Sequence, residues 1–229
     1  DTPAIYPYLQ KFTLPDGTAL ERRAFFTSIR LEKYGEGKIH PHEQTFPKTK
    51  TFLFNLYGSC GTHFGPIFSF YDDPADAASK AMAATMAGEP VADFEEDGVR
   101  HTLWRCDDPE TIASVQKSLS GCEAFIADGH HRYETALEYR REQRRALGDE
   151  SGGAPFDSTL AYLANAYAPG SLLLPIHRVV REVPAPDARG WAQAMPGWNC
   201  RSVTSPGDAR AVSALATETL AKESGRMAF

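Results

Sequence analysis

The segment FIADGHHRYETAL (residues 125–137) places titratable and cationic residues where a short apolar stretch gives way to a helical pattern. The first amide groups of a helix have no partner within it, and the helix dipole adds partial positive charge there. Gly129 permits a sharp turn and close approach by a ligand, and Arg132 offers a fork of donors that fits phosphate oxygens. His130 and His131 can donate hydrogen bonds, titrate near neutrality or bind metal. These four residues therefore form a candidate phosphate-binding turn before a helix expected to begin near Arg132.

Asp128 has two interpretations. It could be the N-cap residue of the following helix, or a catalytic carboxylate that holds the Mg²⁺ accompanying a nucleotide. The whole motif also has a purely structural interpretation, in which Gly129 is a turn residue and the histidines and arginine are ordinary polar residues of a first helical turn. The density of Asp-Gly-His-His-Arg favours the site.

The loop GKIHPHEQTFPK (residues 37–48) holds the second group of candidate residues. Phosphoryl transfer to a hydroxyl needs a carboxylate that orients the hydroxyl and takes its proton, and Glu43 is the candidate base. His40 and His42 are two residues apart, so in an extended segment they point the same way and could bind phosphate or metal. A long irregular loop in a compact domain is more often functional than idle. The alternative is a surface connection in which Glu43 is simply exposed.

A third phosphate contact is a candidate at Arg178, within the segment LLPIHRVV. The commoner interpretation of such a His-Arg pair is polar residues at the edge of a buried strand.

The elements that must position these residues mix strands and helices. Turn residues between aromatic and β-branched segments predict two hairpins, at residues 4–32 and 91–105, the second around Asp97-Gly98. Further strands are expected at residues 64–71 and 123–127, and helices at 48–59, 73–88, 108–121 and about 132–147. A flexible loop is expected at residues 148–158, while periodicity does not decide between strand and helix at 159–167. Without strict βαβ alternation, the pattern predicts an α+β fold with a mixed sheet and flanking helices.

The helix expected at residues 132–147 has two faces. Its inward stripe is expected to contain Tyr133, Ala136, Leu137 and Leu147. Arginines interleave with glutamates at helical spacing on the rest of its surface, which predicts a solvated face, and these arginines are Arg140, Arg141, Arg144 and Arg145.

Residues 1–183 are expected to form the main domain with both motif regions, and residues 184–229 the start of a truncated C-terminal extension or subdomain. The chain has no initiator Met and its last residues, GRMAF, end as another strand could begin, so we expect a fragment or processed form.

Composition limits the classes of function. A net charge of -6 argues against a dedicated nucleic-acid-binding protein. Four scattered cysteines without a Cys-x-x-Cys pair argue against structural zinc and a disulfide scaffold, and favour the cytoplasm. No apolar run is long enough to span a bilayer. The sequence does not decide whether the protein forms a homodimer.

The segments GKIHPHEQTFPK, GPIFSFYDDP, EEDGVRHTLWR, IADGHHRYETAL and LLPIHRVV together resemble the bacterial and archaeal family called domain of unknown function 1015 (DUF1015). The matches occur in order from the first strand to about residue 180. Members of that family are longer at both ends, which agrees with the expected fragment. The family name implies no activity.

The turn at residues 129–132 also resembles, locally, the nucleotide-phosphate site of the ParB/sulfiredoxin superfamily, where a Gly-x-His-Arg turn opens a helix. The resemblance implies that His131 and Arg132 face phosphates. Sulfiredoxin chemistry requires a cysteine where this chain has His130, and is therefore rejected. Free serine kinases of that superfamily resemble this chain in having an acidic residue upstream as the base, here Glu43.

These residues are compatible with three hypotheses. The first is a nucleotide-dependent phosphotransferase that acts on a small hydroxyl metabolite, with free serine as the leading candidate and Mg²⁺ with ATP or ADP as cofactors. Its nucleotide-binding residues would be Gly129, His130, His131, Arg132, His42 and Arg178. The second is a metal-dependent hydrolase that uses histidines and carboxylates of the two motifs as ligands for Zn²⁺ or Mn²⁺. The third is a non-catalytic, ParB-like nucleotide-binding regulatory module.

Overall fold

The computed structural model describes residues 2–14, 16–148 and 151–172, together with Gly190, Gln193, Asp208 and Ala211. The chain divides into two compact units, Asp1–Leu174 and Pro175–Phe229. Arg178 and the expected boundary between residues 183 and 184 lie outside the described residues, so both stay predictions.

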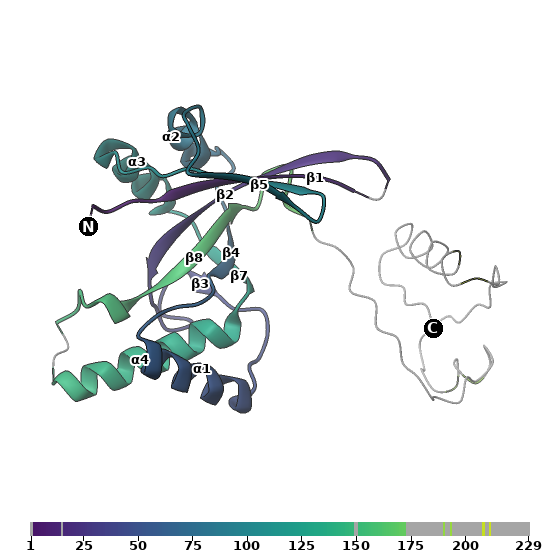
Figure 1. The fold of residues 1–229 in the computed structure, drawn as a ribbon. Coiled ribbons are helices and arrows are strands. Elements are labelled where there is room, and N and C mark those ends of the chain that lie inside the picture. The colour runs from purple at the N-terminus through teal and green to yellow at the C-terminus, as the bar shows by residue number, and fades with distance from the viewer. Residues whose placement is uncertain are drawn as a thin grey trace. The chain divides into compact units, whose positions relative to one another are not determined.

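The first unit is built on a mixed sheet of eight strands in the order β3-β7-β4-β8-β2-β1-β6-β5 (Figure 1). The strands are β1 (Tyr6–Thr13), β2 (Ala19–Arg30), β3 (Ile39–His40), β4 (Ile67–Tyr71), β5 (Ala92–Glu96), β6 (Val99–Leu103), β7 (Ala124–Asp128) and β8 (Ser158–Asn165). The helices are α1 (Pro47–Cys60), α2 (Ala77–Met86), α3 (Pro109–Leu119) and α4 (His130–Leu147), with a 3₁₀ turn η1 (Pro155–Asp157). The predicted α+β class, with a mixed sheet and flanking helices, is confirmed.

Both predicted hairpins are present. β1 pairs antiparallel with β2, and β5 pairs antiparallel with β6. The turn of the second hairpin has Asp97 at φ 50° and Gly98 at φ 75°. Positive φ at both central residues is what a tight turn of this kind requires, and Asp-Gly supplies it at low cost.

The segment that periodicity left undecided is strand β8, in the middle of the sheet. It pairs parallel with β4 and antiparallel with β2. Every residue from Ala161 to Asn165 is buried. A strand that is buried on both faces has no alternation of apolar and polar residues, so its sequence pattern could not distinguish a strand from a helix.

All four helices pack on one face of the sheet. Ile67 and Tyr71 lie on the same side of β4 because an even number of residues separates them. Ile67 packs with residues of α1 and α4, and Tyr71 packs with residues of α2 and α3. The opposite face carries a separate aromatic cluster that includes Phe26, Phe68 and Tyr162, to which no described helix contributes a residue.

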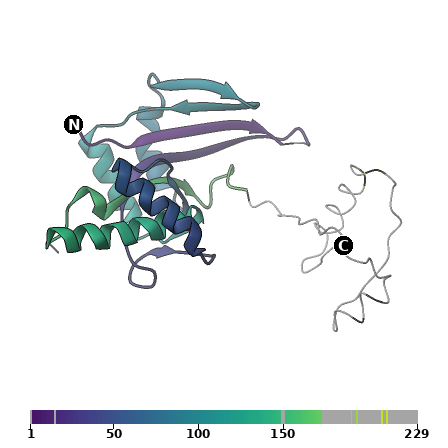
Figure 2. The ribbon, with the colours of Figure 1, turned by 60° about the horizontal axis from the view of Figure 1, so that its bottom comes forward.

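Helices α1 and α4 lie side by side, as Figure 2 shows. The predicted inward stripe of α4 is confirmed for Tyr133 and Ala136, which are 0% and 1% exposed. It is wrong for Leu147, which is 64% exposed because the end of α4 extends past the core. No described helix is both long enough and apolar enough to cross a membrane.

The expected solvated face of α4 is confirmed for Arg141 and Arg145, which are exposed, and is wrong for Arg140 and Arg144. The expected flexible loop after α4 also needs correction. Arg140 donates a hydrogen bond to the carbonyl of Leu31, and Arg144 binds the buried carboxylate of Asp157 at 2.6 Å. Asp157 lies in η1 and also accepts the amide of Ala154. The glycines of residues 148–158 predicted a flexible loop, but the ion pair between Asp157 and Arg144 anchors the end of this segment to α4.

Candidate functional site

The two motif regions meet at the first turn of α4. Strand β3 pairs parallel with β7, with Ile39 opposite Ala124 and His40 opposite Phe125. Parallel strands end at the same edge of a sheet, so the loop after β3 and the helix after β7 leave that edge together. As a result, Oε1 of Glu43 lies 3.2 Å from Nδ1 of His130.

His130 is buried, and its surroundings determine its protonation. Its side chain is 1% exposed, and its Nε2 accepts a hydrogen bond from the backbone amide of His42 at 3.1 Å. Burial lowers the pKa of His130, against the opposing effect of Glu43. The ring is therefore neutral at neutral pH, with the proton on Nδ1, which lies near Glu43 but has no hydrogen-bond partner among the described residues.

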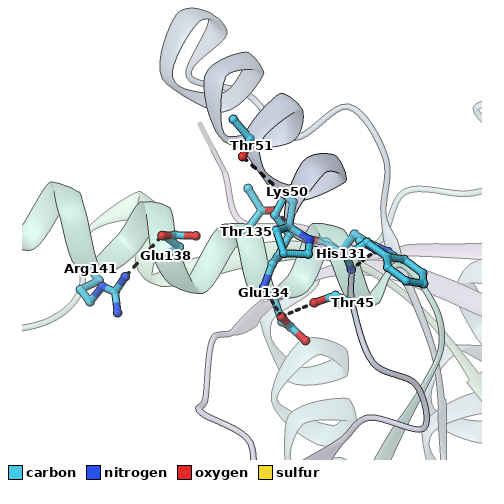
Figure 3. Close-up of polar contacts among 10 residues, drawn as sticks. Thr45, Lys50, Thr51, His131, Glu134, Thr135, Glu138 and Arg141 are labelled. Carbon is cyan, nitrogen blue, oxygen red and sulfur yellow. Dashed lines mark hydrogen bonds and ion pairs between the residues drawn. The ribbon is translucent and has the colours of Figure 1, made fainter.

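His131 and Glu134, near the start of α4, hold the same loop and the start of α1 through further polar contacts (Figure 3). Nε2 of His131 accepts the backbone amide of Phe46 at 2.9 Å, and the two rings stack. Glu134 accepts hydrogen bonds from Thr45 at 2.6 Å and from Lys50 at 2.9 Å. Burial would raise the pKa of Glu134, but these two hydrogen bonds, together with the charges of Lys50 and His131, outweigh it and lower the pKa.

These contacts change the roles expected for the two histidines. Each uses Nε2 to hold the backbone of residues 41–46, which carries Glu43. A direct phosphate contact by either ring stays a prediction, and it would have to use Nδ1. Thr45 and Glu134 were not identified from the sequence, because an isolated Thr and an isolated Glu carry no pattern that reveals their contact.

The start of α4 has the free donors expected of an anion-binding site. The amides of His130, His131 and Arg132 have no acceptor among the described residues, and no side chain caps the helix. The N-cap residue is Gly129, at φ 96°. Asp128 is the last residue of β7 and not the N-cap, so the capping interpretation is wrong.

Arg132 folds back over the turn from which its own helix begins. A Cβ atom on Gly129 would lie 2.9 Å from Nη2 of Arg132, so glycine is needed for this approach. Nη2 donates to the exposed carboxylate of Asp128 at 2.7 Å, while the buried Nε has no hydrogen-bond partner among the described residues. The guanidinium therefore lies at the helix start with donor capacity unused.

His42, Glu43 and His130 could also form part of a metal site, since one ligand atom from each lies within 4.8 Å of the others. His42 suits this role, because its Nδ1 donates to the carbonyl of Ile126 at 2.6 Å and leaves Nε2 as an acceptor. His130 does not suit it. Its Nε2 already accepts an amide, so a neutral ring carries its proton on Nδ1, the atom that would have to bind the metal.

His40 lies apart from this group. Its ring stacks on Phe125 and its Nε2 lies 2.5 Å from Glu123. His42 instead contacts Ile126 and His130, on the opposite face of β7. The expectation that His40 and His42 point the same way is wrong, because β3 ends at His40 and the alternation of side chains ends with it.

Tyr34 is a further residue of the site that the sequence did not reveal. Its ring stacks on Tyr133, and its hydroxyl is buried without a hydrogen-bond partner among the described residues. Burial raises the pKa of Tyr34, and the charges of Glu134 and Glu43 raise it further. The hydroxyl therefore stays protonated and can donate a hydrogen bond.

A profile of the family described as "Protein of unknown function (DUF1015)" matches residues 1–196. No curated protein and no solved structure matches the chain.

Proposed function

Because the chain belongs to the DUF1015 family, whose description assigns no activity, we propose a function from the geometry of the site. The protein is a nucleotide-dependent phosphotransferase that transfers a phosphoryl group to the hydroxyl of a small metabolite, with free serine as the leading candidate. The observation that supports this proposal most strongly is the approach of Glu43 to His130 at 3.2 Å, on the first turn of a helix whose first amides lack acceptors among the described residues.

Glu43 is the base in this proposal. Its side chain is 51% exposed, so a substrate hydroxyl can reach it. Oε1 of Glu43 lies 3.2 Å from Nδ1 of His130 but accepts no hydrogen bond from it, so its carboxylate oxygens stay available to the proton of the substrate hydroxyl.

The nucleotide phosphates would bind at the start of α4. The free amides of residues 130–132 and the guanidinium of Arg132 are donors suited to phosphate oxygens. Asp128 and Arg132 are paired with each other, and in a complex these two side chains would separate. Asp128 would hold Mg²⁺, which neutralises phosphate charge, and Arg132 would bind the phosphate.

Calorimetric titration tests the proposal directly. Full-length protein is titrated with ATP, ADP and CTP in the presence of Mg²⁺, and phosphoryl transfer to serine is followed by ³¹P NMR. Saturable binding of ATP or ADP with transfer to a hydroxyl is the expected result. If none of the three nucleotides binds, the proposal is wrong.

A metal-dependent hydrolase is the second candidate, supported by the proximity of His42, Glu43 and His130. The proton that His130 carries on Nδ1 argues against it. Metal analysis of protein purified without a histidine tag separates the two. Stoichiometric, tightly held Zn²⁺ or Mn²⁺ would favour the hydrolase, whereas Mg²⁺ required only with nucleotide favours the phosphotransferase.

A non-catalytic, ParB-like nucleotide-binding regulatory module remains the third candidate, because the free amides at the start of α4 do not depend on Glu43. Such a module would bind nucleotide without turnover.

A further inference from the structure

A second group of cationic side chains lies near the other end of α4. Arg30, Arg140, Arg144 and Asp157 line a cavity of about 200 Å³, together with residues 151–153. A rise of about 1.5 Å per residue along the helix places Arg144 about 21 Å from His130. The cavity is therefore distinct from the candidate active site.

Among the described residues that line the cavity, arginines outnumber carboxylates by three to one. Asp157 neutralises Arg144 at 2.6 Å, with side chains that are only 10% and 14% exposed. Arg140 donates to the carbonyl of Leu31 but forms no ion pair with a described residue, and neither does Arg30. Two guanidinium groups thus remain without a described counter-ion, in a chain whose net charge is -6.

The dipole of α4 does not explain why all three arginines line this cavity. Cations near a helix C-terminus interact favourably with its dipole, which gives Arg144 an ordinary role. Arg30, by contrast, comes from the end of β2. The one carboxylate among the described lining residues, Asp157, is already paired with Arg144, so a bound anion would relieve the repulsion between Arg30 and Arg140.

We propose that this cavity is a second anion-binding site, which takes the phosphate group of a small phosphorylated metabolite. The guanidinium groups of Arg30 and Arg140 offer forked donors that match the oxygens of a phosphate. Gly152 and Gly153 line the same cavity at φ 88°, a conformation that suits glycine, and a Cβ on Gly152 would lie 3.6 Å from Arg144. The volume has room for several water molecules, which is the scale of a phosphate with a short substituent.

The site is tested by ¹H–¹⁵N NMR titration of the full chain with inorganic phosphate, glycerol 3-phosphate and succinate. The amides of Gly152 and Gly153 report on the cavity, and the amide of Gly129 reports on the start of α4. We expect saturable shifts at Gly152 and Gly153 with one or both phosphate compounds. If glycerol 3-phosphate binds more tightly than inorganic phosphate, the ligand is a phosphomonoester. If the two bind equally tightly, the phosphate group alone is enough for binding.

The variant Arg30→Gln/Arg140→Gln should lose about tenfold or more of this affinity, while shifts at Gly129 persist. The charge-matched control Arg141→Gln/Arg145→Gln, on the same helix but outside the cavity, should keep it. Arg30→Gln alone, which removes an exposed side chain, serves if the double variant does not fold. The proposal is overturned if Gly152 and Gly153 show no saturable shift, if both double variants lose affinity equally, or if succinate binds as tightly as the phosphates. The readout at the two glycines is independent of the proposed activity.

Discussion

The carboxylate of Glu43 and the buried imidazole of His130 face each other at 3.2 Å, the first from a loop and the second from a helix. This contact places the Glu43 carboxylate beside the first turn of α4, where it would serve as the base of the proposed reaction. We expect Glu43→Gln to lower kcat by about 10²- to 10⁴-fold and to leave nucleotide affinity nearly unchanged. Coupled kinetics and calorimetry measure the two quantities, and Glu36→Gln, an exposed glutamate of the same connection, is the control. Equal turnover in wild type and Glu43→Gln would exclude Glu43 as the base.

Arg132 is expected to bind phosphate when its partner Asp128 is engaged elsewhere. Arg132→Gln should weaken nucleotide binding by about 10- to 100-fold, because charge-assisted hydrogen bonds are lost. The nucleotide affinity of Arg132→Lys should lie between those of wild type and Arg132→Gln, since lysine keeps the positive charge but lacks the forked donors of arginine. Calorimetry provides the measurement. Arg141→Gln, an exposed arginine of the same helix, should bind as wild type does, and a loss as large as that of Arg132→Gln would mean that charge alone is responsible.

Gly129 has a role beyond its backbone angle. Both Gly129 and Gly148 have positive φ, so alanine at either position should cost on the order of 1–2 kcal/mol of stability. Only at Gly129 would the new Cβ also meet Arg132, whereas Gly148 has nothing within 4 Å. Nucleotide affinity should therefore fall in Gly129→Ala and not in Gly148→Ala. Matched affinities in the two variants would show that the approach of Arg132 to the turn is unimportant.

Glu134 links the loop to α4 through Thr45 and Lys50. Glu134→Gln should reduce the free energy of unfolding by about 1–3 kcal/mol and also lower turnover, since the loop that carries Glu43 loses an anchor. Glu138→Gln, one turn along the helix, removes only an exposed pair with Arg141 at 3.4 Å and should cost less than about 0.5 kcal/mol. Urea unfolding and steady-state kinetics compare them. Turnover unaffected by Glu134→Gln would show that Glu134 does not help position the base.

His130 makes stability depend on pH. Burial lowers its pKa from the ordinary value of 6.5. The unfolded chain then takes up a proton at a higher pH than the folded chain, so stability is full above about pH 6.5 and falls as the pH drops below it. Urea unfolding between about pH 5 and pH 7.5 should show this loss, and His130→Gln should reduce it. His63, whose pKa is lowered by burial as well, accounts for part of what remains. An identical pH dependence in His130→Gln would assign the effect to other groups.

The sequence indicated the elements with strong local signals. Asp97-Gly98 identified a hairpin, and a short apolar stretch before Gly129 identified β7. The start of α4 was expected at Arg132 but lies at His130, because glycine at the N-cap lets the helix begin at once. β8 had no readable period because both of its faces are buried.

The candidate site was visible as two motifs, but not as a set of contacts. Neither segment shows that β3 pairs parallel with β7, and that pairing is what brings Glu43 to His130. The anchoring role of His131 was equally hidden, because its partner is a backbone amide and any residue could supply one. A hydrogen bond to a backbone amide cannot be predicted from the type of the residue that supplies the amide.

The central position of β8 has a consequence for biosynthesis. Of the eight strands, it is the last to leave the ribosome, yet it joins β4 on one side to β2 on the other. Until it emerges, the other strands can pair only as two partial sheets, each with an unpaired edge where β8 will insert. A translation product that stops before Ser158 would keep both edges exposed, which makes it a ready substrate for chaperones and prone to self-association.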